Sequence, residues 1–272
     1  MPELQILIST YGRDALKKIA ALPHPRMRGV EYLVGWQGHD DAAVPEELQS
    51  RDDFRILRLD SVGLSNSRNA MMEEATAPLA AVSDDDLAYT EQHLLNIMES
   101  FRDHPEMDFI AFRYASDVCP KNYPEESFDL ARPPRGYFVT SMELVLNLGR
   151  IRRKGKMACV WFNKAFGVNG TTFGSGEEDI LITRMLRGGL RGVYLPLDIC
   201  LNTESTTSDR IRGSRGFVET LGACHLYINP KSWPLRMVSH ALRQRGIPAW
   251  RFCRWWIAGV GKARHNDVFA DE

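Results

Sequence analysis

The sequence lacks several features that would assign it to a class at once. Its apolar runs all stay well short of the ~18 residues of a membrane-spanning helix, so an integral membrane protein is not expected. None of its five cysteines forms a CxxC pair, and their odd number argues against a disulfide framework or a zinc site. Neither sign of charge is in excess: 34 Lys and Arg face 35 Asp and Glu, a formal charge of -1, so a nucleic-acid partner is not expected.

The signatures of several enzyme classes are missing as well. The sequence holds no Walker A motif, no Rossmann glycine fingerprint, no Gly-x-Ser-x-Gly elbow and no His-Glu-x-x-His helix. Its first ten residues, MPELQILIST, carry no basic segment before the apolar run and are therefore not typical of a signal peptide. Together with unpaired cysteines, this predicts a cytoplasmic protein, with peripheral contact at the inner face of the cell membrane left open.

What is present is the composition of an ordinary globular protein. Hydrophobic residues make up 44% and charged residues 25% of the 272 residues. At about 150 residues per domain, that length corresponds to one large or two small domains. A chain of this size buries roughly three quarters of its unfolded surface, so a sizeable core is expected.

Apolar runs alternate with helical patterns along the first third of the chain. The patterns predict strands at 4–9, 30–36, 54–59 and 79–82 and helices at 14–22 and 65–75. Such an alternation favours an α/β fold with a mostly parallel sheet. Further along, we expect a strand at 137–142, a helix at 179–186 and a short strand at 193–195 that Pro196 closes.

Two polar clusters directly follow predicted strands. Thr10-Tyr11-Gly12 follows the first strand and Asp84-Asp85-Asp86 the fourth, and ligands of open α/β sheets bind at the carboxyl ends of strands. Three adjacent carboxylates repel one another unless a cation neutralises them. A Mg²⁺ or Mn²⁺ ion held by one or two carboxylates and substrate phosphates would do so. The alternative interpretation is a solvated acidic turn.

A second acidic cluster, Glu177-Glu178-Asp179, follows the glycine-rich stretch Phe173–Gly176 and opens a predicted helix. Acids in a first helical turn are stabilised by the helix dipole without any catalytic purpose. A glycine-rich loop, however, lets the backbone approach a ligand closely, and an acid at its end is well placed as a general base. Taken alone, the cluster leaves both interpretations open.

Three segments, in order, are ILISTYGRD, GLSNSRNAMMEEATAPLAAVSDDD and FGSGEEDILITRMLRGGLRGVYLP. Together they resemble glycosyltransferase family 2, the inverting GT-A nucleotide-sugar transferases. They match the family's opening strand and turn, its Arg-Asn helix with the strand that ends in the DXD motif, and its Glu-Asp motif with the helix and strand that follow. The agreement spans about residues 4–200. It implies a GT-A-like (Rossmann-like) mixed, mostly parallel sheet flanked by helices, with a C-terminal helical extension.

The resemblance also implies an activity. It predicts a metal-dependent inverting glycosyltransferase that moves a sugar from a nucleotide diphosphate sugar, with UDP-sugar favoured, to a glycan or lipid-linked saccharide in polysaccharide biosynthesis. Asp86, helped by Asp84, would hold Mn²⁺ or Mg²⁺. The family's catalytic carboxylate falls on Asp179, with Glu178 as the competing residue.

The nucleotide sugar itself would be bound by Thr10, Tyr11, Gln37, Arg68, Asp84 and Asp85. Tyr11 is expected to stack on the pyrimidine, and Arg68 to position the base or the diphosphate. Gln37 stands where the family usually has an Asp that contacts uracil. An amide both donates and accepts hydrogen bonds, so pyrimidine recognition survives, but the choice between uridine and thymidine stays open.

Three rival functions remain. A sugar nucleotidyltransferase would want a glycine-rich basic loop after the first strand, and 9–13 is too short and too poor in glycine. A glycosidase would use two carboxylates but needs no DXD cluster. An inactive carbohydrate-binding or scaffold protein on the same fold is disfavoured by the intact Asp86 and Asp179, while Gln37 leaves it open.

The resemblance divides the chain into a catalytic domain, 1–205, and an extension, 206–272. The nucleotide-sugar half would cover about 1–115 and the acceptor half about 116–205. Within the extension, 231–264 holds eight Lys or Arg, no acid and four Trp. Its aromatic residues Trp250, Phe252, Trp255 and Trp256 suit either docking on an anionic membrane or packing on the catalytic domain or a partner subunit, as in a homo-oligomer.

Overall fold

The computed structural model describes residues 2–204, 211 and 213–270. Contacts between residues group these into two compact units, which we describe one at a time. The first unit comprises 1–62, 66–161 and 185–204, and the second comprises 63–65, 162–184 and 205–272. The domain boundary predicted at 205/206 lies within 205–210, outside the described residues.

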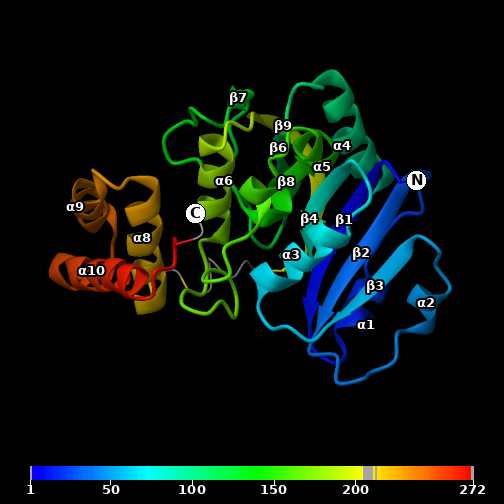
Figure 1. Ribbon diagram of the computed structural model, residues 1–272, viewed down its shortest axis with the longest axis horizontal. Coiled ribbons are helices and arrows are strands. Elements are labelled where there is room, and N and C mark those ends of the chain that lie inside the picture. Colours follow the sequence, from blue (N-terminus) through cyan, green and yellow to red (C-terminus); the bar gives the residue numbers. More distant parts are fainter. Residues whose placement is uncertain (1, 205–210, 212, 271–272) are drawn as a thin grey trace. The chain divides into compact units, whose positions relative to one another are not determined.

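The first unit is built around one mixed, mostly parallel sheet (Figure 1). Its order is β3-β2-β1-β4-β8-β6-β9-β5, with β7 paired to β9. Only β8, β5 and β7 run antiparallel to their neighbours. The strands are β1 (Leu4–Tyr11), β2 (Val30–Gln37), β3 (Phe54–Leu59), β4 (Leu79–Asp84), β5 (Leu87–Ala88), β6 (Phe109–Ala115), β7 (Phe128–Asp129), β8 (Leu144–Asn147) and β9 (Gly192–Asn202). The predicted sheet is confirmed.

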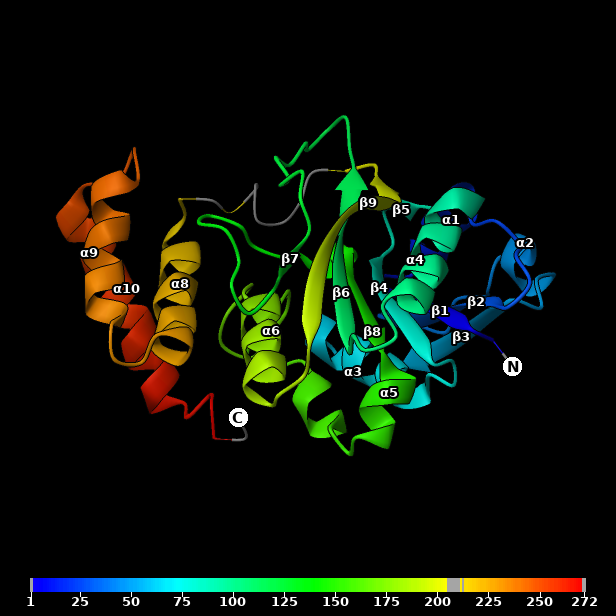
Figure 2. The same cartoon turned by 90° about the horizontal axis from the view of Figure 1, so that it is seen from above.

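Helices cover both faces of this sheet because its central strands are apolar on both sides, as buried parallel strands are. Leu4, Ile6 and Ile8 of β1 join a core cluster with residues of α1 and α4, and α3 and α5 lie on the opposite side (Figure 2). The helices are α1 (Ala15–Ala21), α2 (Glu46–Gln49), α3 (Leu64–Glu74), α4 (Glu91–Asp103) and α5 (Leu148–Arg153). Helix α6 (Glu177–Arg187) belongs mostly to the second unit.

Strand register brings the polar clusters to one edge. Ser9 of β1 pairs with Asp84 of β4, and Tyr11 pairs with Gln37 at the end of β2. Both pairs are parallel, so the segments that follow these strands leave the sheet on the same side. The sequence-predicted polar turns after β1 and β4 are therefore neighbours.

Two predicted elements are wrong. Residues 137–142 form no strand: Tyr137 packs its ring against Tyr194 with centroids 5.2 Å apart, and a 3₁₀ turn, Ser141–Glu143, leads into β8. Pro196 does not end its strand either, because β9 continues to Asn202. The pairing of β6 with β9 shifts between Ala111 and Arg113, and a proline without an N–H is tolerated at such a bulge.

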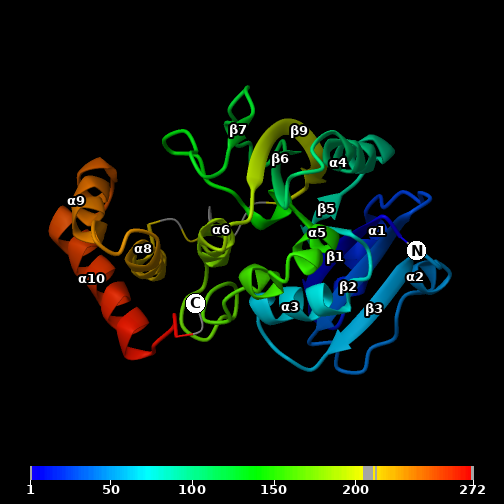
Figure 3. The ribbon, with the colours of Figure 1, turned by 45° about the horizontal axis from the view of Figure 1, so that its top comes forward.

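In the second unit, helices α8 (Arg215–Ile228), α9 (Trp233–Arg243) and α10 (Ala249–His265) lie side by side (Figure 3). Two glycines let α8 and α10 approach closely. A Cβ atom at Gly259 would lie 1.9 Å from the Glu219 carbonyl oxygen, and one at Gly222 would lie 2.3 Å from that of Trp256. The predicted C-terminal helical extension is confirmed. In the part of the chain that the structure describes, no helix is both long and apolar enough to cross a membrane.

Candidate active site

The acidic turn after β4 is anchored by a buried arginine. Arg68 of α3 is 1% exposed, and its Nη2 donates to Asp84 Oδ1 at 3.0 Å and to Ser141 Oγ at 2.7 Å. A guanidinium taken out of water needs such partners. The structure thus places Arg68 beneath Asp84, where it fixes the first carboxylate of the turn.

The second carboxylate of the turn is also engaged. Asp85 accepts a hydrogen bond from the Thr10 hydroxyl and pairs with Lys18 Nζ at 2.9 Å, and Lys18 also pairs with Glu204 at 3.0 Å. These contacts join the end of β1, helix α1 and the segment after β9. Sequence reasoning missed Lys18 and Glu204, because no local spacing connects residues so far apart in the chain.

Asp86 differs from its two neighbours. Its Oδ1 atom is buried and has no hydrogen-bond partner among the described residues. Burial, and next the Asp84 carboxylate, raise the pKa of Asp86 to about 6. The backbone here is fixed, because Thr203 donates to the Asp86 carbonyl oxygen from Oγ1 at 2.7 Å and from its backbone N–H at 3.2 Å.

An orphaned carboxylate oxygen beside a second carboxylate fits a divalent cation, which would relieve the repulsion between Asp84 and Asp86. Among the residues described, no group of three or more His, Cys, Asp and Glu side chains is arranged to hold a metal on its own. An ion at Asp86 would therefore take further ligands from substrate oxygens and water, as Mg²⁺ commonly does. The donor set suits a hard cation that arrives with a phosphorylated substrate.

Tyr11 and Gln37 end neighbouring strands but differ in exposure. Tyr11 is 58% exposed, whereas Gln37 is 3% exposed and its Nε2 donates to Ser61 Oγ at 3.2 Å. The Tyr11 ring lies against Gly38, which has φ +62°, and a Cβ there would be 3.0 Å from ring atoms. Close backbone approach on one side and solvent on the other leave the ring available for a planar ligand.

Glu178 and Asp179 lie in the first turn of α6, in the second unit. The Asp179 side chain is partly open to solvent. Desolvation by the surrounding protein, and next the negative charge of Glu178, raise the pKa of Asp179 to about 6. Preceding Gly176 has φ +90°, and a Cβ there would lie 2.7 Å from Cys224 Sγ. Close packing against Cys224 therefore explains why residue 176 is a glycine, without a ligand near the glycine-rich stretch Phe173–Gly176.

The predicted site residues thus fall into two groups. Direct contacts in the first unit join Thr10, Arg68, Asp84 and Asp85, with Asp86 next in the chain and Tyr11 and Gln37 at adjacent strand ends. Glu178 and Asp179 form the other group in the second unit. Their catalytic and binding roles remain predictions.

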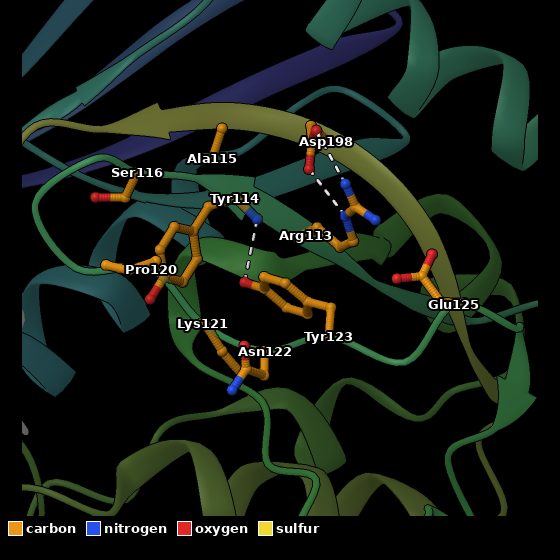
Figure 4. Close-up of a pocket in the computed structure, with 10 residues that line it drawn as sticks. All are labelled: Arg113, Tyr114, Ala115, Ser116, Pro120, Lys121, Asn122, Tyr123, Glu125 and Asp198. Carbon is orange, nitrogen blue, oxygen red and sulfur yellow. Dashed lines mark hydrogen bonds and ion pairs between the residues drawn. The ribbon is translucent and has the colours of Figure 1, made fainter.

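A separate pocket of about 350 Å³ opens at the end of β6 (Figure 4). Arg113 and Asp198 of β9 lie together on one side of it in a two-point ion pair, Nε to Oδ1 at 3.0 Å and Nη2 to Oδ2 at 3.3 Å. The Tyr123 ring forms another wall, and its hydroxyl accepts from the Tyr114 N–H at 3.2 Å. The pocket thus combines an aromatic face with paired donors and acceptors.

A buried carboxylate holds the wall of this pocket in place. Glu143 is 0% exposed and accepts from Lys121 Nζ at 2.6 Å and from the Tyr123 hydroxyl at 2.7 Å. The Lys121 ammonium also lies 4.2 Å from the centroid of the Phe138 ring, a cation–π distance. Sequence reasoning did not identify this anchor, because Glu143 lies about twenty residues from both partners in the chain and no local spacing connects them.

The open α/β sheet, with its acidic turn at the carboxyl end of β4, defines a GT-A-like fold. Residues 40–165 match the family model described as Glycosyl transferase family 2. The predicted resemblance to this family is confirmed over that range, which is a little under half of the chain. The matched range contains Arg68 and the acidic turn but not Tyr11, Gln37 or Asp179.

The solved structures of TarS support the fold. TarS 1–349 from S. aureus in complex with UDP-GlcNAc aligns with a TM-score of 0.57 and 12% identity over 97% of this chain and 73% of that one. The UDP complex of the same protein gives a TM-score of 0.58 and 13% identity over 96% and 80%. The mannosyltransferase PcManGT from Pyrobaculum calidifontis, in complex with GDP-Man and Mn²⁺, gives 0.48 and 13% over 97% and 75%. No curated protein matches the chain.

Proposed function

We propose that the protein is a metal-dependent inverting glycosyltransferase that uses a UDP-sugar and a glycan or lipid-linked saccharide acceptor in polysaccharide biosynthesis. The observation that carries this proposal is the orphaned, buried Oδ1 of Asp86 beside Asp84. That atom lies in the turn after β4, and the neighbouring strand β1 ends at Tyr11, whose ring is exposed. The UDP and UDP-GlcNAc complexes of TarS, a protein of the same fold, favour a uridine nucleotide.

On the donor side, the residues of the first unit bind and orient. Tyr11 stacks on the base and Gln37 reads its edge, while the Thr10–Asp85 contact holds the two strand ends together. Asp86 and Asp84 would hold Mn²⁺ or Mg²⁺, and the bound ion would offset the negative charge of the leaving nucleoside diphosphate. Arg68 keeps Asp84 oriented for this purpose.

On the acceptor side, Asp179 takes the proton from the attacking hydroxyl. A base works best when its pKa lies near the working pH, and the pKa of Asp179 is raised to about 6. The hydroxyl oxygen then bonds to the anomeric carbon from the face opposite the leaving diphosphate, so the configuration inverts. Glu178 raises the pKa of the base through its own charge.

The pocket of Figure 4 is the proposed contact for the acceptor glycan. Sugars present hydroxyl groups around apolar C–H faces, which suit the Tyr123 ring and the donors and acceptors of Arg113 and Asp198. Lys121 and Glu143 keep the ring in place and are already bonded to one another. Most of the residues that line the pocket belong to the acceptor half, 116–205, that the sequence predicts.

The test is release of nucleoside diphosphate from a panel of UDP-, dTDP- and GDP-sugars by the purified protein with Mn²⁺. We expect slow hydrolysis of one UDP-sugar, because water replaces the missing acceptor. Formation of a sugar nucleotide from a nucleoside triphosphate and a sugar phosphate would instead identify a nucleotidyltransferase. If the protein binds UDP tightly but neither hydrolyses a nucleotide sugar nor transfers sugar to added glycans, it is an inactive binding protein.

Tyr11→Ala is expected to weaken UDP binding by about tenfold, because stacking of a base on an aromatic side chain contributes about 1–3 kcal/mol. Isothermal titration calorimetry with UDP and Mn²⁺ measures the dissociation constant. Tyr11→Phe keeps the ring and is the matched control, with affinity expected near that of the wild type. Unchanged affinity in Tyr11→Ala would show that the base binds elsewhere.

A further inference from the structure

The aromatic residues of 231–264 divide into two sets in the structure. Phe252 and Trp256 are 3% and 0% exposed, and the Trp256 ring stacks on His225 of α8 with centroids 5.0 Å apart. These two residues therefore belong to the core of the second unit, where they pack on other helices of the C-terminal extension. Trp250, at 63% exposed, does not.

Helix α9 carries a second apolar face. Ala241 is buried and Met237 packs in the same cluster as Trp256, whereas Leu235, Val238 and Leu242 are 75%, 48% and 78% exposed. The latter three have i, i+3, i+7 spacing and so form one ridge along the helix. No described part of the chain covers this ridge.

Helix α10 also carries exposed apolar side chains along one face, and an arginine lies among them. Trp250 and Ile257, 63% and 51% exposed, are seven residues apart, with Arg254 between them on the same face. The Arg251 guanidinium lies 5.4 Å from the centroid of the Trp250 ring. Exposed aliphatic and arginine side chains thus occur on both helices, and α10 adds the exposed Trp250.

The charge around these side chains has one sign. Segment 231–264 contains no acid, and of its basic residues Lys262 is already paired with Glu219 of α8. The others are exposed: Lys231, Arg236, Arg243, Arg245, Arg251, Arg254 and Arg264. A second copy docking through the same face would bring two such basic segments together, which like-charge repulsion disfavours.

We propose that α9 and α10 dock on an anionic lipid bilayer through the ridge Leu235, Val238 and Leu242 and through Trp250. Interfacial helices combine basic residues with Trp and Leu in this way, and anionic headgroups attract each nearby Lys or Arg. The ridge enters the headgroup region, and the arginines stay at the phosphates. The proposal does not depend on glycosyl transfer, because it concerns binding alone.

The test is co-sedimentation of the full chain with phosphatidylcholine vesicles, with and without phosphatidylglycerol. We expect binding only to the anionic vesicles, and loss of binding at high salt because screening weakens the attraction. The double variant Leu235→Gln, Leu242→Gln is expected to bind about tenfold or more weakly. Leu197→Gln alters an exposed leucine of the first unit, 40% exposed, and is the matched control with unchanged binding.

Circular dichroism checks that each variant is folded. We expect spectra like that of the wild type, because the changed side chains are exposed. Equal binding of the double variant and the wild type would overturn the proposal, and so would equal binding to neutral and anionic vesicles. A vesicle-free dimer in sedimentation velocity that the double variant lacks would overturn it too, because a second copy would then cover the ridge.

Discussion

Asp86→Ala is expected to abolish measurable sugar transfer, with a loss of about 10³-fold or more. Its Oδ1 is the carboxylate oxygen of the acidic turn that is buried and without a partner in the described chain, so a bound cation depends on it more than on its neighbours. Metal ions stabilise transition-state charge by several kcal/mol, and each 1.4 kcal/mol is about tenfold in rate. Initial rates of UDP release, with and without acceptor, measure the loss.

The neighbouring carboxylates supply graded controls. Asp84→Ala is expected to weaken activity, because it removes a metal ligand and leaves the buried Arg68 guanidinium without its carboxylate. Asp85→Ala is expected to be milder, since Asp85 is occupied by Thr10 and Lys18. Calorimetric titration with Mn²⁺ in the presence of UDP gives a second readout. Full wild-type activity in excess EDTA would contradict the metal assignment.

Much of the first unit was predictable from sequence because its strands are short apolar runs between polar turns. Nearly every residue of β1 and β4 is buried, and such short, continuous apolar runs are typical of buried parallel strands. The later strands were harder. Continuation of β9 through Pro196 depends on a bulge against β6 that only the paired strands reveal, and Tyr137 is held by ring contacts with Tyr194 and Phe128 rather than by strand pairing.

The predicted site residues were recognised by type and order, but their contacts were not. The three acids of the turn look equivalent in the sequence, but the structure distinguishes them. Asp84 pairs with a buried arginine and Asp85 with a lysine and a threonine, whereas Asp86 Oδ1 has no partner among the described residues. These differences come from residues on three other segments of the chain, β1, α1 and α3. Local periodicity carries no information about such long-range pairing, so ranking the three acids required the fold.

Asp179→Asn is expected to lower transfer by at least about 10²-fold while leaving UDP affinity nearly unchanged. General-base assistance contributes roughly 10²–10⁴-fold, and an amide cannot accept the hydroxyl proton. Donor binding is expected to depend on Tyr11 and the acidic turn of the first unit, not on α6. Transfer rates and calorimetric UDP binding, measured on the same preparation, separate these two effects.

The pH profile identifies which acid of the pair is the base. A carboxyl group with its pKa raised to about 6 is protonated below that pH, so transfer by the wild type is expected to rise through about pH 6 and level off above it. Glu178→Gln removes the neighbouring charge that helps to raise this pKa; the variant should therefore stay active, with its rise moved to lower pH. The pKa of Asp86 is also raised to about 6, so the profiles are measured at saturating Mn²⁺, which favours the deprotonated Asp86 carboxylate. Under these conditions Asp179→Asn should lose the rise altogether. An active Asp179→Asn together with an inactive Glu178→Gln would instead make Glu178 the base, because only the acid that takes the proton is indispensable.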